Sequence, residues 1–191
     1  MRKTLSALLV IVWIALLPAS LFAQEADWDG QLHRGDLSFE LGFGFGAHGN
    51  GFGYGIAAVP GVEWILADWR LGEVVPLALG IGAKGAVEYI PAGGIGAGAD
   101  VLASIHLGFR GLESSRFIQA LDVYTAAGAG MVFLGGASVP FGLVFPTIYA
   151  GAAWLLRENF ALYLEGVYRR GWRVVGYGGA TFGFRLRRAP G

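Results

Sequence analysis

Apolar residues alternate with small or polar residues along most of this chain. From Gly35 onward, every second position is leucine or phenylalanine, and the positions between them are mostly glycine or polar. The apolar series is Leu37, Phe39, Leu41, Phe43 and Phe45, and the other is Ser38, Glu40, Gly42, Gly44 and Gly46. A period of two places successive side chains on opposite faces of a strand. The segment is therefore predicted to be a β-strand with one apolar face.

Seven further segments repeat this alternation, and most are separated by short runs of turn-forming residues. They lie near residues 52–64, 77–89, 101–110, 117–133, 139–156, 160–169 and 174–186, and residues 67–73 are predicted to form a connection. In the sixth segment the apolar parity changes between Phe145 and Ile148. Pro146 lies at the change and cannot donate to a ladder, which predicts a bulge. The chain thus has eight predicted strands.

The last of these segments reads VVGYGGATFGFRL and lies close to the end of the chain. Ala180, Phe182, Phe184 and Leu186 share one face of it. A terminal strand this apolar would leave an aggregation-prone edge, and pairing with the first strand would remove that edge. The pattern therefore favours a closed barrel.

Composition narrows the class of protein further. The 191 residues include 33 glycines and no cysteine, only 15% are charged, and the formal net charge is zero. The lack of cysteine excludes a disulfide scaffold, and the zero net charge gives no excess of basic residues that would bind nucleic acid. Residues 123–156 carry no charge, which leaves a helical membrane protein as an alternative, but glycine and proline interrupt them. A soluble β-sandwich would need polar outer faces. We predict an all-β fold, an eight-stranded antiparallel up-and-down transmembrane β-barrel.

The N-terminal segment differs from the rest of the chain. Arg2 and Lys3 precede an apolar run over residues 5–17, and the small residue Ala23 precedes Gln24. This order is typical of a cleaved signal peptide, with an uncleaved membrane anchor as the alternative. We therefore divide the chain into a signal peptide (1–23), a loose periplasmic leader (24–34), the barrel (35–187) and a tail (188–191).

Aromatic residues provide an independent check on this topology. If the leader is periplasmic, alternate strand directions place aromatic residues at both rims of the barrel, where amphipathic rings lie in a bilayer. The periplasmic set is Trp64, Trp69, Phe109, Phe117, Trp154, Phe160, Phe182 and Phe184. The outer set is Phe45, Phe52, Tyr54, Tyr89, Phe133, Phe141, Tyr168, Trp172 and Tyr177.

The final strand also carries a recognisable pattern. Tyr177, Gly179, Phe182 and Phe184 form a motif that resembles the C-terminal assembly signal of bacterial outer-membrane barrels, although RLRRAPG follows it here. With the eight-strand architecture, the chain resembles OmpA-, OmpX- and OmpW-type barrels over residues 35–186. The resemblance implies a monomer in the bacterial outer membrane, in contact with its lipid and recognised by the barrel-assembly machinery. The outer loops are short, which argues against an adhesin or receptor.

Charged residues fall on the inward face of the predicted strands. They are Glu40, Glu63, Lys84, Glu88, Asp100, His106, Arg110, Asp122, Glu165, Arg169 and Arg185. The interior of an eight-stranded barrel is just wide enough to be filled by side chains, so buried charges there must pair. We expect Glu40 to pair with Arg185, and Arg110 with Asp122. The set is predicted to be a structural salt-bridge plug or, alternatively, a narrow polar path for a small solute.

Small residues occupy the inward positions of the outer half of the barrel. This distribution predicts either a blind vestibule rimmed by Glu88, Asp100 and Arg169, open to the outside, or walls already in contact. A vestibule would suit a small apolar or amphipathic ligand, which makes a binding or uptake protein the alternative function.

Catalysis, cofactors and metals are not expected. Ser104, His106 and Glu88 could form a hydrolase constellation, but they face the interior while lipid lies outside. Two G-x-G-x-x-G matches, at residues 44–49 and 80–85, lack the following helix that dinucleotide binding needs. The three histidines, His33, His48 and His106, are too scattered for a metal site. The sequence therefore predicts a structural or narrow-channel protein and no enzyme.

Overall fold

The computed structural model describes residues 31–48, 53–72, 75–91, 94–110, 115–134, 141–157, 159–171 and 177–188. The predicted signal peptide, residues 24–30 of the leader and residues 189–191 of the tail lie outside these ranges.

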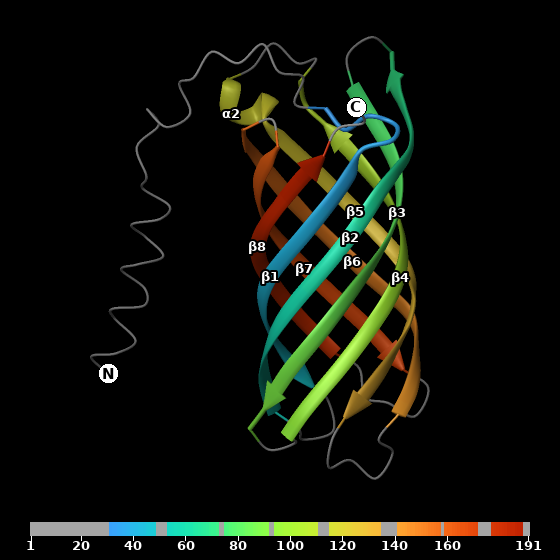
Figure 1. The fold of residues 1–191 in the computed structure, drawn as a ribbon, viewed down its shortest axis with the longest axis vertical. Coiled ribbons are helices and arrows are strands. Elements are labelled where there is room, and N and C mark those ends of the chain that lie inside the picture. Colours follow the sequence, from blue (N-terminus) through green and yellow to red (C-terminus); the bar gives the residue numbers. More distant parts are fainter. Residues whose placement is uncertain are drawn as a thin grey trace, which may run out of the picture.

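Eight antiparallel strands form one closed barrel in which each strand pairs with the next and β8 pairs with β1 (Figure 1). The strands are β1 (Leu37–His48), β2 (Gly53–Leu71), β3 (Val75–Ile90), β4 (Gly94–Gly108), β5 (Leu121–Leu134), β6 (Phe141–Arg157), β7 (Phe160–Gly171) and β8 (Tyr177–Arg188). We call the end where β1 begins and β8 finishes the terminal end, and the opposite one the far end. The predicted fold class is confirmed.

Closure runs along the whole length of the first strand. β1 pairs with β8 from Leu37 opposite Arg188 to His48 opposite Tyr177, and its other edge pairs with β2 over the same residues. No part of β1 keeps an unpaired edge, as the apolar character of the last strand predicted.

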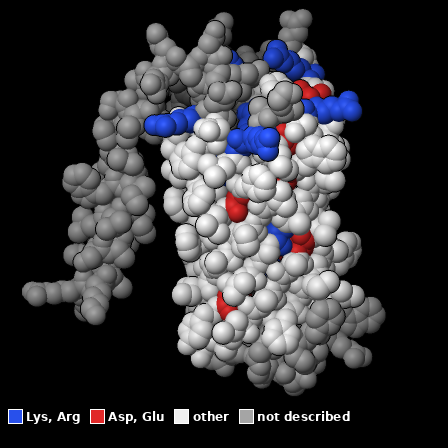
Figure 2. All heavy atoms as spheres, in the orientation of Figure 1, with Lys and Arg blue, Asp and Glu red and all other residues white. Residues whose placement is uncertain are grey.

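The two faces of the barrel wall follow the alternation. Large apolar side chains point outward and are exposed, for example Phe43 (67%), Tyr54 (76%), Val101 (72%) and Phe145 (73%). Inward positions of the same strands are buried. On the face drawn in Figure 2, the Lys and Arg side chains gather at the terminal end, and the wall below them is largely uncharged.

Pro146 lies in a register shift, as predicted. Pairing of β6 with both β5 and β7 passes from Val144 to Thr147 without Pro146. The shift lets Val144 and Thr147 both face inward, which accounts for the change of parity in the sequence.

Three predicted boundaries were wrong. The fourth strand begins at Gly94 rather than near residue 101, because its first residues pair with β3 up to Ile90. Residues 67–71 are strand rather than connection, because a register shift between Ile65 and Ala67 lets β2 continue pairing with β3 to Leu71. The fifth strand begins at Leu121 rather than near Phe117. The residues before it form the helical turn α2 (Arg116–Gln119), in which Ile118 and Gln119 donate backbone hydrogen bonds to Ser115. Among the described residues, no helix is long and apolar enough to cross a membrane.

The leader is not loose where it meets the barrel. Leu32 packs with Ile65 and Ala78 at the terminal end, and Gly35 donates a backbone hydrogen bond of 2.8 Å to Ile65. Asp36 is fully buried and pairs with Arg187 at 2.7 Å. Residues 31–36 therefore cover the terminal mouth of the barrel, because an apolar side chain and a buried ion pair both hold them there.

Candidate functional site

The inward charges of four strands meet in the middle of the barrel. Arg185 of β8 donates to Glu40 of β1 (2.7 Å), and Lys84 of β3 lies 2.8 Å from the same carboxylate. Lys84 also contacts Glu165 of β7 at 2.5 Å. The predicted Glu40–Arg185 pair is therefore present, but it is part of a larger network, because alternation along every strand points these side chains into one narrow space.

His106 extends this network toward β2 and β5. Its Nδ1 lies 2.9 Å from Asp122, and its Nε2 lies 2.9 Å from Glu63. Ser104 donates to the same Glu63 carboxylate, and Arg185 donates to Asp122 at 3.1 Å. An imidazole with a carboxylate at each nitrogen links β2, β4 and β5 across the barrel. We call this whole set the central network: Glu40, Glu63, Lys84, Ser104, His106, Asp122, Glu165 and Arg185.

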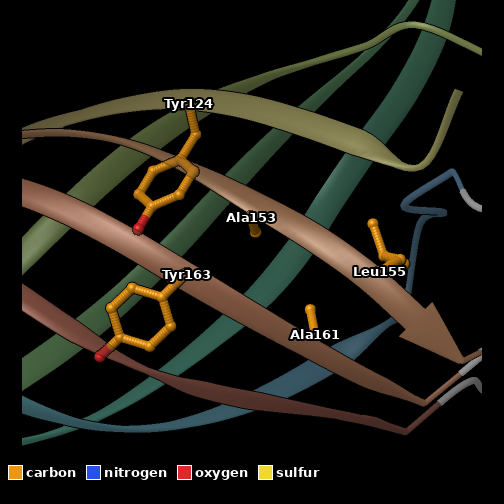
Figure 3. Close-up of a cluster of buried hydrophobic side chains, with 5 residues drawn as sticks. All are labelled: Tyr124, Ala153, Leu155, Ala161 and Tyr163. Atoms are coloured by element: carbon orange, nitrogen blue, oxygen red, sulfur yellow. The ribbon is translucent and has the colours of Figure 1, made fainter. Parts of the chain in front are cut away.

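Tyrosines surround the ammonium group of Lys84 in the central network. The Lys84 ammonium lies 5.0 Å from the ring centroid of Tyr149, 5.4 Å from that of Tyr163 and 5.9 Å from that of Tyr124. Tyr124 donates to Glu165 at 2.9 Å. Figure 3 shows Tyr124 of β5 and Tyr163 of β7, the two strands that flank β6, in one buried cluster with Ala153, Leu155 and Ala161. Aromatic faces attract a desolvated ammonium, so the tyrosines help to hold Lys84 in place.

A second cluster lies closer to the far end. Asp100 of β4 accepts hydrogen bonds from Arg169 of β7 (3.0 Å from Nε) and from Tyr149 of β6 (2.6 Å). Thr147 donates to the same carboxylate at 3.3 Å. All four side chains are buried. We call them the far cluster: Asp100, Thr147, Tyr149 and Arg169.

Two of the predicted interior residues lie apart from both groups. Glu88 is buried on β3 opposite Gly96, four residues further toward the far end than Lys84, which lies opposite Asp100. Arg110 was wrongly placed in the interior. It is exposed beyond Gly108, where β4 ends, and Asp122, its expected partner, contacts His106 and Arg185 instead. The strand ends two residues before Arg110, so the alternation no longer directs its side chain.

One small residue of the predicted vestibule lies in a packed region. Ala126 forms a buried cluster with Leu102, Val167 and Tyr149 of the far cluster. A Cβ added to Gly44 would lie 3.0 Å from Thr181 Oγ1 and 3.2 Å from Ala180 O. Both atoms belong to β8, the strand that pairs with β1 at this position, so the choice between a vestibule and touching walls stays a prediction.

The remaining candidate residues of β8 lie on the wall as expected. Phe182 is about half exposed, and Phe184 stacks on Phe160 of β7 with 6.3 Å between ring centroids. Gly179 pairs with Gly46 of β1 and Val167 of β7, and Tyr177 with His48 and Arg169. The assembly signal is therefore part of the closing strand; its recognition stays a prediction.

Ser104, His106 and Glu88, the residues considered as a hydrolase constellation, are not arranged as a triad. Ser104 bonds to Glu63 rather than to His106, and both side chains are buried inside the barrel. No group of three or more His, Cys, Asp or Glu side chains among the described residues could hold a metal ion. Sequence reasoning missed Thr147 and Tyr149, although the change of parity at Pro146 could have identified both as inward residues.

Comparison with solved structures identifies the fold. No protein-family model matches the chain, and no curated protein sequence does so. Ail, the attachment invasion locus protein of Yersinia pestis, is 13% identical, with 81% of this chain and 99% of that chain covered at a TM-score of 0.53. Its complex with the heparin analogue sucrose octasulfate matches at 0.52, with 13% identity, 81% of this chain and 99% of that chain. The outer membrane enzyme PagL is also 13% identical and covers 79% of this chain and 98% of its own, at 0.50.

These similarities concern the fold alone, because only 13% of the aligned residues are identical. The described residues form a closed, antiparallel, eight-stranded barrel with an apolar wall and a polar interior. The resemblance predicted from the sequence is thereby confirmed at the level of architecture: this chain has the fold of the small eight-stranded outer-membrane barrels.

Proposed function

We propose that this chain is a bacterial outer-membrane barrel protein with a structural role, whose interior is sealed rather than open to solutes. The observation that carries the membrane assignment is the outer wall. Phe39, Phe43, Ile56, Val87 and Val101, from four different strands, are each half exposed or more. Soluble monomers rarely expose apolar patches of this extent, whereas a barrel with satisfied backbone groups can place them in lipid.

The structural role rests on the interior. The central network joins β1, β2, β3, β4, β5, β7 and β8, and the far cluster joins β4, β6 and β7. Removing one partner from such a buried pair is strongly destabilising, so the side chains resist separation. A solute would have to break several of these contacts at once, which favours a plug over a narrow channel.

A non-enzymatic role fits the positions of the reactive groups. Ser104 and His106 are exposed by only 3% and 2%, and their polar atoms bond to carboxylates of the network. A lipid substrate on the outside of the wall would not reach them. PagL shares the fold and is an enzyme, so the fold alone does not decide this point.

The remaining parts of the proposal concern biogenesis. We propose export by the signal peptide 1–23, contact with outer-membrane lipid, recognition of β8 by the barrel-assembly machinery, and a monomeric state. Closure of β1 on β8 supports the monomer, because it leaves no edge for pairing with another copy.

Fractionation of cells that express the protein tests this proposal. We expect it in the outer membrane, with faster gel migration when the sample is not boiled and a β-type circular dichroism spectrum. A control sample boiled before loading should migrate at the unfolded position. Recovery in the soluble fraction, or a helical spectrum in detergent, would end the proposal.

A further inference from the structure

Aromatic rings form a row on the outer wall at the terminal end. Phe117 of α2 lies 5.7 Å from Trp154 of β6, and Phe160 of β7 lies 6.3 Å from Phe184 of β8, measured between ring centroids. Register connects the two pairs, because Leu162 lies opposite both Trp154 and Phe184. The two ring pairs therefore lie on adjoining parts of the wall from α2 across β6 and β7 to β8, with Leu162 between them.

Two arginines accompany this row. Arg157 of β6 lies opposite Phe160 of β7, which in turn lies opposite Leu186 of β8. Arg188 follows Leu186 by two residues and therefore shares its outward face. Both arginine side chains are exposed. We call the set the aromatic–arginine rim: Phe117, Trp154, Arg157, Phe160, Phe184 and Arg188.

The turn before β5 extends the apolar wall beyond the strands. Phe117 and Ile118 are 62% and 39% exposed, and the tilted ring contact between Phe117 and Trp154 holds α2 against the barrel. Exposed apolar side chains at this level cannot be explained by packing within the protein. They continue the surface that the proposed function places in lipid.

We infer that the aromatic–arginine rim is a binding site for the headgroup of an anionic glycerophospholipid. The inference rests on the proposed membrane location. Aromatic rings favour the boundary between acyl chains and headgroups, and a guanidinium recognises a phosphate through paired hydrogen bonds. The two exposed arginines supply the complementary charge, while the bilayer supplies the acyl chains for the adjacent wall. The expected ligand class is phosphatidylglycerol or a related anionic phospholipid.

Quenching of Trp154 by brominated lipids tests the site. The protein is refolded into phosphatidylcholine vesicles that contain brominated phosphatidylglycerol or, separately, brominated phosphatidylcholine. The Trp154 signal is the difference from a Trp154→Phe variant. We expect several-fold stronger quenching by phosphatidylglycerol, since one arginine near an anionic surface contributes about fivefold in affinity. Arg157→Gln/Arg188→Gln should reduce the preference to near equality.

A matched control separates this site from general charge attraction. Arg34→Gln/Arg170→Gln also removes two exposed arginines, one at the terminal mouth and one at the far end, and should keep the preference. Equal loss in both double variants would overturn the inference, as would displacement of the brominated phospholipid by unlabelled lipid A. If the protein inserts but both lipids quench equally, only this inference fails. If it does not insert and remains protease-sensitive, the proposed function fails instead.

Discussion

At the scale of single residues, neighbouring backbone decides which glycines of this barrel can change. Gly128 of β5 faces inward, and a Cβ there would overlap the backbone carbonyl oxygen of Val101 on β4. Gly166 of β7 faces outward, and its nearest neighbours would lie 3.8 and 3.9 Å from an added Cβ. Sequence alone cannot separate the two positions, because both are glycines within an alternating strand.

This contrast gives a first prediction. Gly128→Ala should lower the free energy of unfolding by about 1–3 kcal/mol, because backbone must move to admit the methyl group. Gly166→Ala should leave it unchanged or raise it by about 0.4–1 kcal/mol, because alanine restricts the unfolded chain. Urea titration in detergent micelles, followed by tryptophan fluorescence, measures both. Equal effects of the two substitutions would contradict close contact at Gly128.

The charged interior yields a second prediction at the residue scale. Glu40→Gln leaves Arg185 and Lys84 without one of their carboxylates, so we expect a loss of about 3–5 kcal/mol in the free energy of unfolding. Arg185→Gln should cost a similar amount, and the double variant about 0.5–3 kcal/mol less than the sum. Full recovery is not expected, since Lys84 and Asp122 stay charged. Strict additivity in urea unfolding would show that the pair does not interact, and Arg170→Gln at the exposed far end is the control.

At the scale of elements, the strands were easier to predict than the segments that flank them. Alternation identified all eight strands, but α2 and the packing of residues 31–36 were missed. A single turn of helix has too few residues to show a period, and the leader residues are held by contacts with β2, β3 and β8. These contacts are long-range and leave no local signal.

The leader segment allows a third prediction. Arg187→Gln should lower the free energy of unfolding by about 3–5 kcal/mol in a zwitterionic detergent, because Asp36 is fully buried against Arg187. Arg188→Gln, at the exposed neighbouring position, should change it by less than about 0.5 kcal/mol. Urea unfolding measures the stability, and limited proteolysis reports on residues 31–36. Identical behaviour of the two variants would mean that the buried pair does not hold the leader.

The closing strand provides a fourth prediction. Phe182 lies opposite Phe43 and Leu164, and Phe184 lies opposite Leu41 and Leu162. Phe182→Ala and Phe184→Ala should each reduce the amount of folded barrel in the outer membrane more than deletion of residues 189–191. The reason is that these aromatics belong to the motif that resembles the assembly signal, whereas the deleted residues follow it. Unboiled gels of membrane fractions measure the folded amount, and equal assembly of all three variants would remove the terminal strand from this role.

At the scale of the whole molecule, the barrel is a closed wall around ionic and aromatic contacts. Residues 31–36 cover the terminal mouth, the central network fills the middle, and the far cluster follows it toward the far end. The central network and the far cluster together draw side chains from every strand. The interior contacts therefore join the strands of the barrel to one another. A path for solutes would require several of these layers to separate.

The filled interior gives a fifth prediction, which conductance of the refolded protein in planar bilayers tests. We expect no steady unit conductance, because the described interior is filled from the terminal mouth to the far cluster. An open porin recorded in the same bilayers serves as the positive control. Reproducible current steps for this protein, with or without a candidate solute, would replace the sealed barrel with a narrow channel.

Four features could be predicted from the sequence: the strand number, the inward and outward faces, closure of the last strand on the first, and the Glu40–Arg185 pair. These features follow from a period of two, which alternation records directly. Only the tertiary structure decided that His106 links Glu63 to Asp122, that Arg169 pairs with Asp100, and that Arg110 stays outside. Such partners lie on different strands or depend on where a strand ends. Their meeting therefore depends on the stagger between strands, which alternation does not record.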